Sequence, residues 1–310
     1  MTIFISTMNQ IVFLFGFIAI GYGLMKAQVL PDNTSAVLSK LENVLFIPAL
    51  VLGTFIDNFT LDKIRTAWKL LLISSIIGLI AIPVAILVSR LVTKDRYTRN
   101  IYTYGLSFSN FGFMGNAVVS SLFPDMFFDY LIFTLPLWVL IYLWGVPRLL
   151  IADAGKKQTL KESLKSFANP MFLAMLVGMV IGLLKIAMPV WLTNLISVSG
   201  SCMSPVAMLL TGVVVSKISL RKAFTNLRVY AISIVRLLMM PGVFIVAASF
   251  LHLSDTVFYC ALCSLAMPLG LNTIVIPSAL GKDTSEAAGM AMISHLLAVG
   301  TIPLLFMIVG

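Results

Sequence analysis

The chain alternates between long apolar runs and short polar segments. A run of about 20 apolar residues is long enough to cross the hydrocarbon core of a bilayer as one helix. Reading each run between its polar neighbours predicts an all-α polytopic membrane protein with ten transmembrane helices. Their expected ranges are 4–26, 34–56, 68–92, 101–123, 127–151, 170–188, 192–216, 227–251, 257–280 and 286–309.

The composition agrees with a surface that faces lipid. Of the 310 residues, 60% are hydrophobic and 11% are charged, whereas soluble proteins carry about 25% charged residues. The formal net charge of +9 could indicate a nucleic-acid partner, but such proteins gather Lys and Arg on one continuous face. Here the basic residues form short clusters between apolar runs, so we expect a lipid bilayer and no nucleic acid as partner.

The clusters of basic residues predict the orientation, because cytoplasmic loops collect Lys and Arg. With the N-terminus outside, sixteen of them lie at cytoplasmic ends of the expected spans: Lys26, Lys40, Arg90, Lys94, Arg96, Arg99, Arg148, Lys156, Lys157, Lys161, Lys165, Lys217, Arg221, Lys222, Arg228 and Lys282. The opposite side holds four: Lys63, Arg65, Lys69 and Lys185. Both termini are therefore expected on the non-cytoplasmic side of a cell inner or plasma membrane.

The two halves of the chain show a weak internal repeat. Shifting the sequence by 157 or 158 residues aligns helix-disrupting residues of three successive spans: Pro48 with Pro205, Pro83 with Pro241, and Gly112 with Gly270. Each half has five spans, and an odd number makes the second half enter the membrane from the opposite side. We expect a first five-helix repeat at 1–152, a cytoplasmic linker at 153–166 and a second, inverted five-helix repeat at 167–310.

Polar and helix-breaking residues interrupt the fourth and ninth expected spans, at 107–116 and 266–273. A break inside the membrane exposes backbone donors that must line a polar cavity, and a half-helix N-terminus favours an anion. The alternative is a packing kink, since membrane helices often use small residues for close approach. The candidate substrate contacts are Asn110, Gly112, Asn116, Pro268, Gly270, Asn272 and Thr273.

Three ionisable side chains are expected inside spans, where such groups are costly and often functional. Glu42 lies in the second span, beside the candidate substrate contact Asn43, and is either a site of proton coupling or an interfacial carboxylate. Arg236 either binds a substrate carboxylate or forms a structural ion pair, for example with Glu42. His295 is either a site of proton coupling or a hydrogen-bonded packing residue.

Other kinds of chemistry are not indicated. Cys202, Cys260 and Cys263 lie in apolar stretches without an accompanying His or carboxylate cluster, so we expect core residues and no metal site. No phosphate loop or nucleophile motif is present, so we expect neither a cofactor nor an enzyme. Trp138 and Trp191 are candidate interfacial anchors, as is Trp144.

Several short motifs point to a known family. They are LENVLFIPAL at 41–50, NFGFMG at 110–115, LNTIVIP at 271–277, GKD at 281–283, EAA at 286–288, and the segment from Ser294 to Pro303. Together they resemble the auxin efflux carrier family, over essentially the whole chain. The resemblance implies a scaffold and a transport domain built from two inverted five-helix repeats, with helices 4 and 9 broken and crossing at the midplane, where substrate binds.

Members of this family are similar to permeases for organic anions, including bacterial dicarboxylate carriers and plant auxin exporters. Two positions depart from the family pattern: Asn116 stands where we expect proline, and His295 where we expect a small hydroxylated residue. Either change could alter the substrate or the coupling ion. The linker at 153–166 is short, which resembles a compact prokaryotic carrier more than the plant exporters with their long insert.

The leading hypothesis is a secondary transporter for a small organic anion, such as a mono- or dicarboxylate, that works by alternating access. One alternative is a sodium-coupled organic-anion symporter of the bile-acid-carrier type. Another is a membrane receptor that uses the same pocket without transport. The sequence leaves open the identity of the anion, the direction of transport, the coupling ion (H⁺ or Na⁺) and whether the protein is a homodimer.

Overall fold

The structure, a computed structural model, describes residues 2–151, 159–165, 168–217 and 224–309. Within these ranges the chain is built from helices joined by short turns. The α-helices are α1 (Thr2–Lys26), α2 (Thr34–Leu41), α3 (Ile47–Asn58), α4 (Leu61–Val92), α5 (Arg96–Ser107), α6 (Asn116–Leu122), α7 (Phe127–Leu140), α8 (Leu160–Lys165), α9 (Pro170–Leu184), α10 (Val190–Ser201), α11 (Met203–Ser216), α13 (Leu227–Ile234), α14 (Met240–Leu251), α15 (Asp255–Ala266), α16 (Asn272–Ala279) and α17 (Ser285–Val309). The π-helical segments are η1 (Glu42–Phe46), η2 (Phe111–Gly115), η4 (Ile141–Ile151) and η6 (Val235–Met239), and η3 (Pro124–Met126) is a 3-10 turn.

The lengths of these helices confirm a multi-pass membrane protein. Among the described residues, six helical stretches are long and apolar enough to span a bilayer: Thr34–Asn58, Ala67–Val92, Pro124–Ile151, Val190–Ser216, Leu227–Leu251 and Ser285–Val309. Each coincides with one of the expected spans. The first, fourth, sixth and ninth expected spans correspond to shorter apolar helices: Val12–Lys26, Phe111–Leu122, Pro170–Leu184 and Asp255–Ala266.

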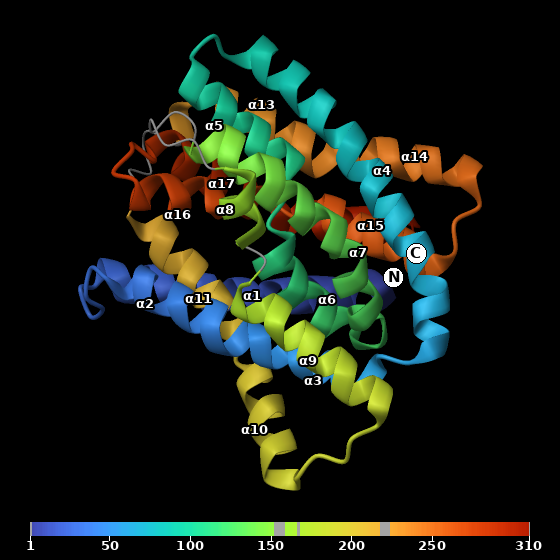
Figure 1. The fold of residues 1–310 in the computed structure, drawn as a ribbon. Coiled ribbons are helices and arrows are strands. Elements are labelled where there is room, and N and C mark those ends of the chain that lie inside the picture. The colour runs from blue at the N-terminus through green and yellow to red at the C-terminus, as the bar shows by residue number, and fades with distance from the viewer. Residues whose placement is uncertain (1, 152–158, 166–167, 218–223, 310) are drawn as a thin grey trace.

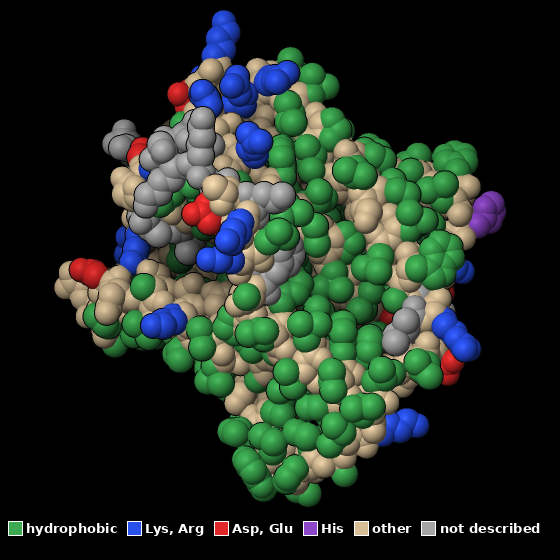
Figure 2. Space-filling model, in the orientation of Figure 1, with side chains coloured by type: hydrophobic (Ala, Val, Ile, Leu, Met, Phe, Trp, Pro, Cys, Tyr) green, Lys and Arg blue, Asp and Glu red, His purple; other side chains and the backbone are tan. Residues whose placement is uncertain are grey.

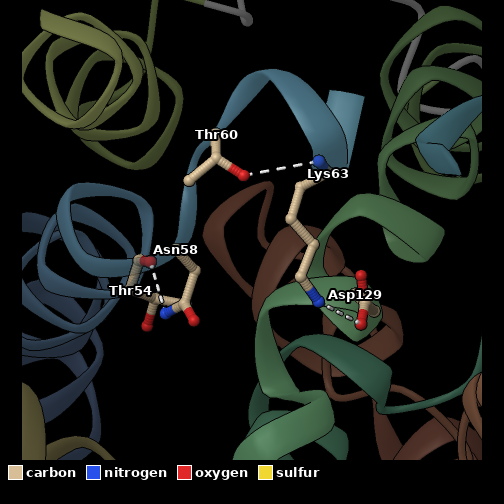
Figure 3. A network of polar contacts seen from close by, with 5 residues as sticks. All are labelled: Thr54, Asn58, Thr60, Lys63 and Asp129. Carbon is tan, nitrogen blue, oxygen red and sulfur yellow. Dashed lines mark hydrogen bonds and ion pairs between the residues drawn. The ribbon is translucent and has the colours of Figure 1, made fainter. Parts of the chain in front are cut away.

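Two helices begin earlier than the apolar pattern predicted, because a side chain caps each N-terminus. The hydroxyl of Thr60 accepts the Lys63 N–H at 3.4 Å, so α4 begins at Leu61 and not at residue 68 (Figure 3). The carboxylate of Asp95 accepts the Thr98 N–H at 2.7 Å, so α5 begins at Arg96 and not at residue 101. The hydrogen bond from the Thr98 backbone lowers the pKa of Asp95 below its usual value.

An ion pair joins the start of α4 to the start of α7. Figure 3 shows the Lys63 Nζ pointing at the Asp129 Oδ2, at 3.1 Å. Across the turn, the Asn58 amide donates to the Thr54 carbonyl at 2.9 Å and closes the end of α3. The pair is partly exposed, so we expect it to orient the two helix ends and to contribute little to stability.

The helices form two groups, one above the other in the view of Figure 1. The lower group holds α1, α2, α3, α9, α10 and α11 with η1, and in it α1 packs on α11 and α3 packs on α9 and α10. The upper group holds α4, α5, α6, α7, α13, α14, α15, α16 and α17 with η2, η4 and η6, and in it α4 packs on α5 and α7, and α17 packs on α13. Contacts of α1 with α17 and of α11 with α6 join the groups.

The lower group is held by unusually close contact between α1 and α11. A Cβ added at Gly21 of α1 would lie 2.3 Å from the Leu209 carbonyl oxygen, and one added at Gly212 of α11 would lie 2.0 Å from the Ile18 oxygen. Both clashes are with backbone, which cannot move aside. Small residues that let helix backbones approach are the usual means of packing helices in lipid, where the hydrophobic effect supplies no force between helices.

Basic side chains gather toward one end of the molecule. On the face drawn in Figure 2 they lie mainly over the region of α2, α5 and α8, while hydrophobic side chains cover the broad middle. Four of the basic residues used to predict orientation, Lys156, Lys157, Arg221 and Lys222, lie outside the described residues, as does half of the expected linker at 153–166. The part of that linker that the structure describes forms α8.

Substituting Gly21→Ala should destabilise the protein by about 1–3 kcal/mol, because the added methyl overpacks the α1–α11 contact. Gly16→Ala on the same helix is the matched control, since a Cβ there meets nothing within 4 Å. The control should be neutral or slightly stabilising, because Ala is the better helix former. Thermal unfolding in detergent measures both, and equal melting temperatures would contradict the close packing.

Candidate functional site

The helical chain is interrupted at two places far apart in sequence, and the two interruptions touch. α5 ends at Ser107, and helix resumes with η2 only after Asn110. α15 ends at Ala266, and α16 begins six residues later, at Asn272. Ser109 and Leu269 form an isolated antiparallel bridge, and the Asn110 N–H donates to the Pro268 carbonyl at 2.7 Å. The four half-helices therefore meet at a backbone crossing.

The interruption in the first half is shorter than the sequence indicated. Gly112 and Asn116 were expected inside it, but both lie in the helix that follows. Gly112 is needed for packing, because a Cβ there would lie 2.6 Å from the ring of Trp138. Gly270 does lie in the second interruption. A Cβ added there would lie 3.2 Å from the carbonyl oxygen of Phe108, so the absence of a side chain lets the two backbone segments approach closely.

Arg236 of η6 binds the carbonyl ends of both interrupted helices. Its Nη1 donates to the Leu106 carbonyl at 2.9 Å, its Nη2 to the Ser264 carbonyl at 3.0 Å, and its Nε to the Met267 carbonyl at 3.4 Å. The side chain is buried. A cation is favourable at this place, because the unpaired carbonyls at a helix C-terminus carry partial negative charge. The guanidinium thus joins the C-termini of α5 and α15.

The ion pair with Glu42, which was one alternative for Arg236, is not formed, because the guanidinium is bonded to carbonyls. Glu42 is fully buried at the start of η1, and neither of its oxygens has a hydrogen-bond partner within the described residues. Its neighbour Asn43 is exposed and donates from Nδ2 to the Ser39 carbonyl at 2.7 Å. The two residues on this helix therefore have opposite surroundings.

The buried imidazole of His295 contacts the crossing directly. Its Nδ1 lies 2.7 Å from the Ala291 carbonyl oxygen, and its Nε2 lies 3.2 Å from the Asn110 Nδ2. Because a carbonyl can only accept, Nδ1 carries the proton that is donated to Ala291. In the neutral ring Nε2 is then an acceptor, and the amide of Asn110 is the donor.

A cavity of about 190 Å³ lies between the two helix groups and reaches the crossing. The lower group lines it with Ser39, Asn43, Ile47, Pro170, Met171, Leu210 and Val214, together with Asn169 just before α9. The upper group lines it with Gly112, Phe113, Trp138, Tyr142, Val146, Leu271, Asn272 and Ile276. All of these side chains are uncharged. A narrow continuation of about 20 Å³ is lined by Asn110, Gly270 and Tyr104, among others.

The structure brings together some of the residues singled out from the sequence and separates others. Asn43, Asn110, Gly112, Gly270 and Asn272 line the cavity or its continuation. Pro268, Thr273 and Arg236 bond within the crossing, whereas Asn116 is buried in α6 and lines neither this cavity nor its continuation. The Thr273 hydroxyl, for example, donates to the Gly270 carbonyl at 2.8 Å.

Sequence reasoning missed part of the cavity wall. Trp138 was a candidate interfacial anchor, but its ring packs edge-on against Phe111 and lines the cavity. Ser39 and Tyr142 were not considered, because they lie toward the ends of spans where polar residues are common. Tyr104, which accepts the Asn272 amide at 3.1 Å, gave no signal within an otherwise ordinary helix.

A second and wider cavity, of about 790 Å³, opens at the other end of α3. Its wall begins at Ala49 and Leu50, while the first cavity ends at Ile47 on the same helix. Along α3 the two cavities are thus separated by less than one turn. At the second cavity the hydroxyls of Ser120 on α6 and Ser204 on α11 lie 3.5 Å apart.

A family model described as membrane transport protein matches residues 6–306 of the chain. The chain belongs to the auxin efflux carrier family. The resemblance drawn from the sequence motifs is therefore confirmed. No curated protein matches the chain.

Membership of the auxin efflux carrier family makes this protein a membrane transporter with a small-molecule substrate and a lipid environment. In such a carrier, a cavity that lies between two helix groups and ends at interrupted helices has the position expected of a ligand site. The described wall of this cavity is uncharged, and the buried guanidinium of Arg236 lies behind the crossing.

Arg236→Met should lower the stability of the carrier by roughly 3 kcal/mol, because carbonyls at the ends of two helices lose a charged donor while remaining buried. Arg228→Met is the matched control, since Arg228 is exposed at the start of α13. Denaturation in mixed detergent measures both variants. An equal loss of stability in the two variants, or no loss of stability in Arg236→Met, would contradict the capping role.

Proposed function

We propose that this carrier is a secondary transporter for a small organic anion, a mono- or dicarboxylate, and that the anion binds where the cavity meets the crossing of the fourth and ninth spans. The observation that carries the proposal is the set of helix N-termini at the cavity. η2 and α16 both begin there, at Phe111 and Asn272. The first N–H groups of a helix have no intrahelical partner and attract anions.

The cavity wall supports this ligand class. Asn43, Asn110 and Asn272 place amide groups along it, and its described lining contains no carboxylate to repel an anion. The volume of about 190 Å³ is below the range of roughly 300–1,000 Å³ typical for drug-sized ligands. A small carboxylate fits this space better than a large amphipathic anion of the bile-acid type.

The packing of the helices supports an inverted repeat. If residues 1–152 and 167–310 are equivalent halves, the contact of α1 with α11 corresponds to the contact of α9 with α3, and both are present. In the same way, α4 with α5 corresponds to α14 with α15, and α3 with α7 to α11 with α17. Ten spans in two inverted five-helix repeats account for these pairs.

The two cavities support alternating access. They lie on opposite sides of the short stretch around Pro48, and the second is lined mainly by α3, α10 and α11, with Ser120, Ser121, Pro124 and Phe127 contributed by the region of α6 and α7. Movement of the upper group against the lower group would close one cavity and open the other while the crossing carries the anion between them. The clustering of basic residues at one end favours a protein of the cell inner membrane with both termini on the non-cytoplasmic side.

Alanine substitution of Asn110 or Asn272 should weaken binding of the transported carboxylate by tenfold or more, because a hydrogen bond to a charged group contributes about 1.5–3 kcal/mol. Asn194→Ala is the matched control, since Asn194 is exposed on α10 and outside both cavities. Counterflow of labelled succinate and pyruvate into liposomes measures the effect. Unchanged counterflow in both site variants would overturn the site, and binding without counterflow in the native protein would favour the receptor.

Uptake of the carboxylate into liposomes should not require Na⁺. The carbonyls at the ends of α5 and α15, which could otherwise hold a cation, are occupied by Arg236. Replacing Na⁺ by choline on both sides of the liposome membrane should leave the initial rate of uptake unchanged, with K⁺ replacement as the ionic-strength control. A strict need for Na⁺ would favour the sodium-coupled symporter instead.

A further inference from the structure

The amide of Asn110 presents opposite chemistry at its two ends. Its Nδ2 donates to His295, and its oxygen has no hydrogen-bond partner among the described residues. Asn110 lines the narrow continuation of the cavity, at the proposed anion site. With neutral His295, one of the two Nδ2 hydrogens is donated to the ring, so the amide offers the ligand one N–H beside an unpaired carbonyl oxygen, and that oxygen repels a carboxylate.

Protonation of His295 would reverse this arrangement. Nδ1 is already engaged as the donor to the Ala291 carbonyl, so an added proton has to sit on Nε2. Nε2–H then faces the Asn110 amino group as a second donor, and the contact becomes repulsive. Rotation of the amide by half a turn restores the hydrogen bond, with the Asn110 oxygen as acceptor. Both N–H donors of the amide are then left for the ligand.

No titratable side chain of the described helices around His295 is hydrogen-bonded to its ring, so a bound anion would be the group that stabilises the protonated form. α17 packs against α1, α5, α11, α13, α15, α16 and η6. Their titratable or charged side chains are Tyr22 and Lys26 of α1, Arg96, Tyr97, Arg99, Tyr102 and Tyr104 of α5, Arg228 and Tyr230 of α13, Asp255, Tyr259, Cys260 and Cys263 of α15, and Arg236 of η6. α17 adds Glu286, nine residues before the imidazole, where it accepts from Tyr102 and from the Asn226 amide. None of these side chains is hydrogen-bonded to His295, whose ring contacts Asn110 and Ala291.

We propose that His295 and Asn110 form a proton-coupled donor switch, in which protonation of Nε2 turns the Asn110 amide so that its N–H₂ group faces the carboxylate. This inference rests on the proposed function. Anion and proton then bind together. The bound anion stabilises the protonated ring and the turned amide, and protonation of the ring in turn strengthens binding of the anion. By linkage, each raises the affinity for the other equally, so the carrier moves an anion together with a proton.

The protein has two histidines, which makes a matched test available. His252 is exposed at the C-terminal end of α14 with a φ of 46°, a conformation that Asn tolerates. Binding of labelled succinate is measured between about pH 6.5 and pH 8.5, where its carboxylates stay ionised. In the native carrier and in His252→Asn, the Kd should rise by up to about tenfold per pH unit, whereas in His295→Gln it should not change with pH.

A spectroscopic measurement keeps the test independent of transport and of the folding of His295→Gln. In His252→Asn labelled with ¹⁵N-histidine, the remaining signals come from His295. Without ligand at high pH they should report a neutral ring protonated at Nδ1, and added succinate should convert it to the doubly protonated form. No binding of either succinate or pyruvate at any pH would count against the proposed function. Binding with a ring that stays neutral, or with unchanged pH dependence in His295→Gln, would overturn the switch alone.

Discussion

The structure depends on satisfying the backbone of two interrupted helices inside an apolar interior. An unpaired N–H or C=O group in a bilayer has no water to bind, so a break persists only where protein supplies the partner. Here each interruption supplies it to the other, through the Ser109–Leu269 bridge and the bond from Asn110 to Pro268. Neither break would be stable alone. The fourth and ninth spans therefore have to meet, and the surrounding helices pack around that meeting point.

The same requirement explains the buried cation. Two helix C-termini converge at the crossing, and their carbonyls would repel one another without a shared donor. The guanidinium of Arg236 has several N–H donors in a planar fork, and it binds carbonyls from both termini. A lysine would bring the charge but not this spread of donors. The position therefore requires the shape of arginine as well as its charge.

Much of this architecture could be predicted from the sequence, because apolar runs and sparse prolines are strong local signals. Six of the expected spans coincide with long apolar helices, and both interruptions lie within the regions expected for them. The family followed from the short sequence motifs. The role of Arg236 did not follow, since its partners are backbone carbonyls on α5 and α15, far away in the chain and without a residue-specific signal. Trp138 was misplaced for a related reason: only the packing against Gly112 shows that it faces the cavity.

The arrangement separates the two polarities of the interrupted helices. The C-terminal ends of α5 and α15, which carry partial negative charge, are turned toward Arg236. The N-terminal ends of η2 and α16, which carry partial positive charge, begin at the cavity. An anion bound as we propose would therefore meet donors, while the opposing ends are already neutralised. A cavity without a lysine or arginine in its described wall can in this way favour an anion and still release it, because no direct ion pair has to be broken.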